Sequence, residues 1–133
     1  MRRLTNQQGF TLIELLIVIV IIGILATIAM RVFWSAKDRG LEATLQSDLK
    51  TVAVHQETYY EENFTYSLDP DSLANFNTSP GVDLDITYAA TDGWAGIVSS
   101  PSLANKRCGL LIGAAPSGSA GPATIPGRLH CGP

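Results

Sequence analysis

Residues 1–69 contain no proline, and the whole chain has two cysteines and fewer basic than acidic residues. Without proline, nothing in this first half removes a backbone donor or clashes with a preceding helical turn. There are 9 Lys and Arg against 12 Asp and Glu, so the formal net charge is −3. Because Arg2 and Arg3 stand at the N-terminus, the remainder is more acidic still. A nucleic-acid-binding face would be basic, so no nucleic acid is predicted as a direct partner.

Motifs for catalysis and for nucleotide binding are also missing from the sequence. His55 and His130 have no acidic or nucleophilic residue at a spacing typical of a catalytic group. The stretch 113–118 resembles the start of a phosphate-binding loop, but Ser119 and Ala120 stand where Lys and Ser or Thr are required. We therefore expect no catalytic residue, no cofactor and no metal site, and the chain is predicted not to be an enzyme. A membrane-tethered enzyme or ligand-binding domain is the alternative from a different class.

What the chain does have is one long apolar run, residues 10–30. Its interruptions are Thr11, Glu14, Gly23 and Thr27. As a helix it would be about 31 Å long, which matches the hydrocarbon core of a bilayer. Arg2 and Arg3 before it favour a single crossing with the N-terminus in the cytoplasm.

Helical periodicity continues after the apolar run, over residues 31–60. The apolar and neutral positions recur every three or four residues and form one stripe, namely Leu41, Leu45, Leu49, Val52, Gln56 and Tyr59. We place the charges of this segment on the other faces, Asp38, Glu42, Asp48 and Lys50 among them. The pattern predicts one helix from about Phe10 to about Tyr60 whose second half is amphipathic and needs a partner surface.

Residues 61–133 read as a small antiparallel sheet domain. Strict alternation over 82–88 puts Val82, Leu84, Ile86 and Tyr88 on one predicted face. Further strands are expected at 94–99, 107–112 and 128–131, with an irregular loop at 113–127. The predicted fold class is therefore α+β, a long N-terminal helix packed on three or four antiparallel strands.

The two cysteines, Cys108 and Cys131, follow the apolar run and would lie outside the cytoplasm, where thiols are oxidised. A disulfide between them would close a loop of about 24 residues and restrict the unfolded chain by about 3 kcal/mol. Two unrelated buried thiols are the alternative.

The N-terminus fits two ordinary interpretations incompletely. A secretory signal would be cleaved after the apolar run, near Thr27 and Ala29, whereas a signal anchor would stay uncleaved. Neither explains a glycine directly before the apolar run, Gly9, or a carboxylate five residues after it, Glu14.

The stretch QQG followed by FTLIELLIVIVIIGILATIA, after a short basic leader, strongly resembles the type IV pilins, including the pseudopilins of type II secretion. The resemblance extends more loosely through the segment YYEENFTYS, the turn TDGWAG and the cysteine pair. It implies that residues 1–9 are a leader removed after Gly9, and that the new N-terminal residue, Phe10, is methylated on its amine.

The resemblance also implies a role for Glu14 in filament assembly. An unpaired carboxylate among the apolar helices of other subunits would cost several kcal/mol, and the Phe10 amine of a neighbouring subunit would compensate it. The sequence departs from the family at Arg31, where proline is common and kinks the helix.

These features predict a structural subunit of a type IV pilus. It would be made as an inner-membrane precursor and assembled outside the cell as a helical homopolymer. The implied partners are further copies of the chain, a prepilin peptidase, an assembly ATPase and an inner-membrane platform. The alternative is a pseudopilin of type II secretion, or a minor pilin for adhesion or DNA uptake.

The expected parts of the chain are the leader 1–9, the membrane and filament-core helix 10–30, its amphipathic continuation 31–60 and the sheet domain 61–133.

Overall fold

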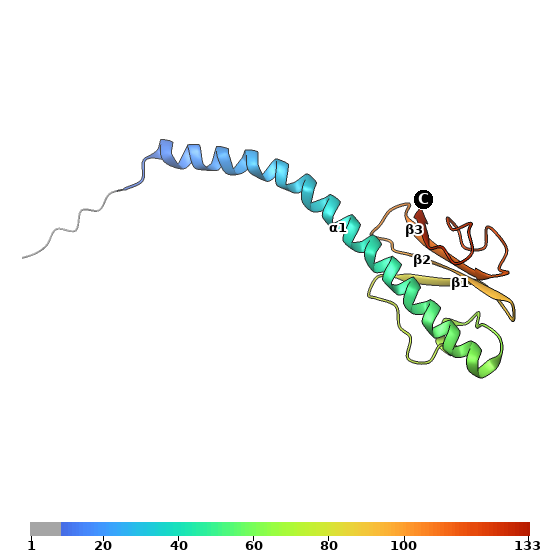
Figure 1. The fold of residues 1–133 in the computed structure, drawn as a ribbon. Coiled ribbons are helices and arrows are strands. Elements are labelled where there is room, and N and C mark those ends of the chain that lie inside the picture. The colour runs from blue at the N-terminus through green and yellow to red at the C-terminus, as the bar shows by residue number, and fades with distance from the viewer. Residues whose placement is uncertain (1–8) are drawn as a thin grey trace, which may run out of the picture. The chain divides into compact units, whose positions relative to one another are not determined.

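The computed structural model describes residues 9–133 and has the predicted α+β architecture (Figure 1). Its elements are the helix α1 (Leu12–Asn63), the short 3-10 helix η1 (Pro70–Ser72) and the strands β1 (Asp83–Ala90), β2 (Gly93–Ser99), β3 (Arg107–Gly113) and β4 (His130–Gly132). Contacts divide the chain into two compact units, one that ends at Lys37 and one that comprises Asp38–Pro133.

The first unit is the N-terminal part of α1. Its helix is long and apolar enough to cross a membrane, and every side chain from Leu12 to Lys37 is exposed. The helix continues through Arg31 without interruption, as expected for a residue that keeps its backbone N–H. This unit therefore buries nothing by itself, and its apolar surface needs a partner outside the chain.

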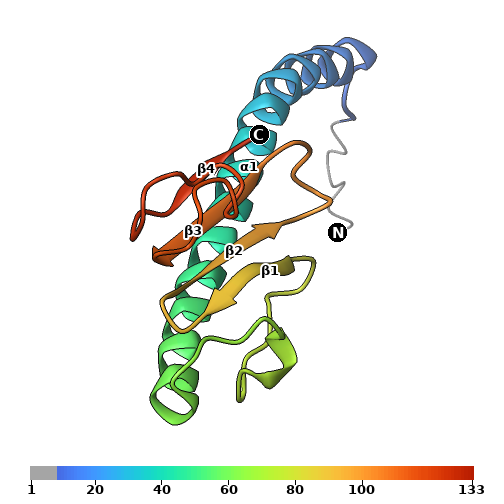
Figure 2. The same ribbon diagram turned by 90° about the vertical axis from the view of Figure 1, so that its right-hand side faces the viewer.

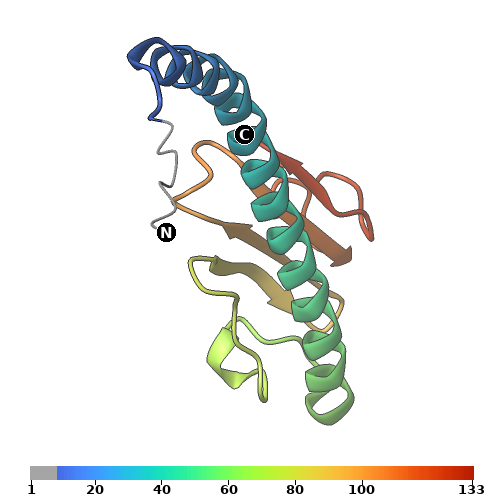
Figure 3. The same ribbon diagram turned by 90° about the vertical axis from the view of Figure 1, so that its left-hand side faces the viewer.

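In the second unit the remainder of α1 lies across the sheet, as seen from the helix side in Figure 3. Leu45, Leu49 and Val52 are fully buried, which confirms the predicted stripe. They belong to one core with apolar side chains of three strands, Ile86, Trp94, Val98, Cys108 and Leu110. The amphipathic half of the helix and the sheet thus cover each other's apolar surface.

Two polar side chains of this helix face hold the segment that follows it. The amide of Gln56 is fully buried and pairs with the backbone of Ser67, donating to its carbonyl at 2.7 Å and accepting from its N–H at 2.9 Å. Asp48 was predicted on a face other than that of the stripe, and this is wrong, because its carboxylate is buried and accepts hydrogen bonds from the N–H and the hydroxyl of Ser79, both at 2.8 Å. These bonds compensate the burial of the charge.

The four strands form one antiparallel sheet in the order β1-β2-β3-β4, which Figure 2 shows with the sheet in front of the helix. The register of β1 against β2 shifts between Ile86 and Tyr88. Ile86 packs in the core under the helix, whereas Tyr88 packs in a second cluster. The prediction that these two side chains share a face is therefore wrong, since a bulge breaks the alternation.

The second cluster covers the other side of the sheet. It joins Ala95 and Leu111 of the central strands to three buried alanines of the β3–β4 loop, Ala115, Ala120 and Ala123. Gly109 permits this close approach, because a Cβ atom there would overlap with the carbonyl of Ala120. The irregular loop expected at 113–127 is thus present, but it also serves as the second layer of the core.

Candidate functional site

The predicted processing site lies directly before the helix. Gly9 and Phe10 have no regular secondary structure, and both are exposed. The other residues of the predicted leader, residues 1–8, lie outside the described part of the chain. An exposed, non-helical segment is the backbone state that a protease requires, so the geometry at this junction is compatible with cleavage.

Glu14 lies in the first turn of α1, where it forms a capping box with Thr11. The Thr11 backbone N–H donates to Oε2 of Glu14 at 2.9 Å, and the Glu14 N–H donates to the hydroxyl of Thr11 at 3.3 Å. The Thr11 hydroxyl also donates to the same carboxylate oxygen at 2.8 Å. Two backbone donors at the helix start, which lack partners within the helix, are thereby satisfied.

The capping role of Glu14 was missed in reading the sequence, although its signal is present. Thr11-Leu12-Ile13-Glu14 has the spacing of a Thr followed three residues later by Glu, directly before an apolar run. The carboxylate also lies at the positive end of the helix dipole. Glu14 is thus stabilised within its own chain in the absence of any partner subunit.

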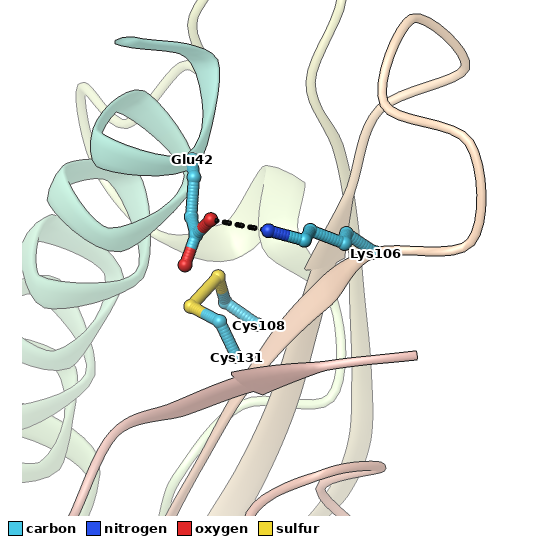
Figure 4. A network of polar contacts seen from close by, with 4 residues as sticks. All are labelled: Glu42, Lys106, Cys108 and Cys131. Atoms are coloured by element: carbon cyan, nitrogen blue, oxygen red, sulfur yellow. Dashed lines mark hydrogen bonds and ion pairs between the residues drawn. A yellow bond between two sulfur atoms is a disulfide. The ribbon is translucent and has the colours of Figure 1, made fainter. Parts of the chain in front are cut away.

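The predicted disulfide is present, between Cys108 of β3 and Cys131 of β4. These residues are direct partners across the two strands, and Cys108 is buried in the core beneath the helix. Figure 4 shows the disulfide beside an ion pair in which Lys106 Nζ lies 2.9 Å from Glu42 Oε2. The disulfide thus ties the short edge strand to the sheet, and the ion pair joins the residue directly before β3 to α1.

Two further polar residues have structural contacts. His55 lies against Phe76, with ring centroids 5.5 Å apart, and Asp69 caps η1 by accepting the N–H of Asp71 at 3.0 Å. Over residues 9–133, no three His, Cys, Asp or Glu side chains converge in a way that could hold a metal ion.

Comparison with known proteins bears directly on this helix start. A family described as the prokaryotic N-terminal methylation motif matches residues 4–30. The type IV wide pilus major component PilA4 of Thermus thermophilus is 33% identical over 92 residues, which cover 67% of this chain and 70% of that protein. The chain belongs to the type IV pilin and pseudopilin family.

Other members of the family are named for different assemblies. The type II secretion system core protein G of Klebsiella michiganensis is 33% identical over 94 residues, 71% of this chain and 66% of that protein. The fimbrial protein of Neisseria meningitidis is 39% identical over 80 residues, 59% of this chain and 42% of that protein. This pilin-family chain therefore spans less than two thirds of the length of these two relatives. Its apolar helix and its pilin relatives support membrane anchoring and assembly into a filament.

Proposed function

We propose that the chain is the structural subunit of a type IV pilus, made as a single-pass inner-membrane precursor with its N-terminus in the cytoplasm. The observation that carries the proposal is the apolar helix of residues 12–37. None of its side chains is buried, although Asp38–Pro133 has a closed core of its own. Such a helix requires two successive environments in this proposal, the lipid of the membrane and then the helices of neighbouring subunits.

In this function the leader is removed after Gly9 and the Phe10 amine is methylated. Cleavage turns the Phe10 nitrogen into a cation next to Thr11, at the end of the helix that Glu14 caps. In the precursor the carboxylate is satisfied by Thr11. In a filament it would be surrounded by apolar helices, where the Phe10 amine of a neighbour supplies the compensating charge.

The division of the chain follows the same proposal. Residues 1–9 are the leader, 10–30 the membrane and filament-core helix, 31–60 its amphipathic continuation and 61–133 the sheet domain at the filament surface. The partners are other copies of the chain, the prepilin peptidase and the inner-membrane assembly platform with its ATPase. The chain itself is not an enzyme in this proposal, and the assembled filament is extracellular.

The second candidate is a pseudopilin of type II secretion. Its support is the similarity to the core protein G of Klebsiella michiganensis, which covers 71% of this chain. The cysteine pair that closes β4 onto the sheet favours the pilus subunit. A minor pilin for adhesion or DNA uptake is a further alternative, and it would be assembled in the same way.

Two measurements on the native cells test the proposal. Mass spectrometry of the purified protein should find an N-terminus at methylated Phe10, and a terminus near Met30 would overturn the processing step. Shearing the cells should release filaments in which this chain is the main component. A chain that is processed at Phe10 but confined to the envelope would instead identify a pseudopilin.

A further inference from the structure

An aromatic and cationic cluster lies just beyond the apolar run, on the exposed helix of the first unit. The rings of Phe33 and Trp34 meet edge to face with centroids 5.8 Å apart. The ammonium of Lys37 lies 5.1 Å from the centre of the Trp34 ring, within cation–π range. We call these three residues the Trp34 cluster.

Packing within the chain does not account for this cluster. Phe33 is 62% exposed and Trp34 is 52% exposed, and the compact second unit begins only at Asp38. Large aromatic side chains that stay about half exposed forgo part of the free energy that burial would give them. The cluster therefore calls for an environment outside the chain, as the apolar run before it does.

The position of the cluster along the helix indicates which environment this is. At 1.5 Å per residue, the helix from Leu12 to Phe33 is about 32 Å long, close to the thickness of a hydrocarbon core. Tryptophan is enriched at the boundary between hydrocarbon and headgroups, because its ring has an apolar body and a polar N–H. Arg31 and Lys37 stand three residues before and three residues after Trp34, and long cationic side chains at such a boundary extend their head groups toward anionic lipid phosphates.

We infer that the Trp34 cluster docks in the phospholipid headgroup layer on the far side of the membrane and fixes the depth of the precursor helix. The inference rests on the proposed function, which places residues 10–30 across the membrane. Because α1 is continuous from Leu12 through Lys37, anchoring at Trp34 also sets the level of Glu14 and of the Gly9–Phe10 junction at the opposite face. The cluster thus sets the depth in the membrane at which the processing site lies.

Tryptophan fluorescence of the full chain tests the inference, since the chain has two tryptophans in opposite settings. Trp94 is fully buried in the core under the helix and serves as an internal reference. The chain is reconstituted at low density in phosphatidylcholine and phosphatidylglycerol vesicles that carry bromine either near the headgroups or near the chain ends. The Trp34 signal is the difference between the wild type and Trp34→Phe, so the core is left unchanged.

The expected result is that shallow bromines quench Trp34 more strongly than deep bromines, while the Trp34→Phe variant is quenched by neither. Stronger quenching by deep bromines, or no quenching of Trp34, would overturn the inference. Flotation of the vesicles separates this failure from failure of the proposed function. A chain that floats with an unquenched Trp34 refutes only the cluster's role, whereas a chain that does not float refutes the membrane anchor as well.

A charge variant tests the contribution of Lys37. Lys37→Gln removes the cation that holds Trp34 at the headgroups, so the ratio of shallow to deep quenching should fall. Lys50→Gln, which removes an exposed lysine of the second unit, should leave the ratio unchanged. Equal ratios for both variants would show that Lys37 does not act at the headgroup layer, against the inference.

Discussion

The carboxylate of Glu14 and the N–H and hydroxyl of Thr11 are joined by hydrogen bonds of 2.9 and 2.8 Å, so the one acidic residue of the apolar run is already satisfied within its own chain. This separates two roles that substitution by alanine would confuse. One is capping the helix, which requires only an acceptor. The other is charge compensation in a filament, which requires the negative charge itself.

Variants at this pair should separate the two roles. Glu14→Gln keeps an acceptor for the Thr11 N–H but removes the charge, which leaves the proposed partner amine buried and unpaired at a cost of about 3–5 kcal/mol. We expect Glu14→Gln to insert into the membrane normally and to yield far fewer filaments, as measured by immunoblotting of sheared and membrane fractions. Glu62→Gln, an exposed change at the other end of α1, is the matched control.

Thr11→Val makes the complementary change, because it removes the capping hydroxyl and keeps the charge of Glu14. The helix start should lose about 1 kcal/mol, and filaments should still form. Wild-type filament yield from Glu14→Gln, together with poor yield from Thr11→Val, would show that the cap rather than the charge governs assembly.

Gly109 should tolerate no side chain, since a Cβ atom there would overlap with the carbonyl of Ala120. Gly109→Ala would push the β3–β4 loop off the sheet and should lower the free energy of unfolding by about 3 kcal/mol. Gly40→Ala is the control, because a Cβ atom at this helical position meets no neighbour and should add about 1 kcal/mol. Urea denaturation of the full chain in detergent measures both. Equal stability of Gly109→Ala and the wild type would contradict the packing described.

The sequence predicts the helix and the strands well where their patterns are long and regular. The absence of proline and the stripe through Leu45, Leu49 and Val52 placed α1 within about three residues of its ends. The pattern failed at Tyr88 because one bulge after Ile86 reverses which side every later residue of β1 faces. The alternation of apolar and polar residues contains no signal that would indicate such a bulge.

Other features were missed for different physical reasons. Asp48 lies within the buried stripe, three residues after Leu45, but its charge suggested a different face and only the fold reveals that Ser79 satisfies it. The second core layer is made of alanines in a Gly- and Pro-rich segment, whose composition is that of an irregular loop. At the helix start the spacing of a capping box was present in the sequence, but the same residues were interpreted only as part of a membrane segment.

The disulfide should supply a large part of the stability of the sheet domain. Replacing both Cys108 and Cys131 by alanine removes the restriction on the unfolded chain and should lower the free energy of unfolding by about 3 kcal/mol. Reducing the wild type with dithiothreitol should produce a similar loss, which controls for the change of side chains. A loss under about 1 kcal/mol in both experiments would show that the β3–β4 pairing holds without the covalent bond.

Tyr66 should make stability fall with rising pH at the alkaline end. Burial, and then its hydrogen bond to Glu57 at 3.1 Å, raise the pKa of Tyr66 to about 12 from the ordinary value of 10.0. Between these two pKa values the tyrosine of the unfolded chain is deprotonated while that of the folded chain still holds its proton. Deprotonation therefore stabilises the unfolded state, and the free energy of unfolding declines as the pH rises from 10.0 to about 12. Below that window the contribution is constant.

Urea denaturation at stepped pH should show this slope in the wild type and a shallower one in Tyr66→Phe. Tyr88, whose pKa is also raised, accounts for part of the remaining slope. An identical slope in Tyr66→Phe would mean that Tyr66 titrates at its ordinary value in the folded chain.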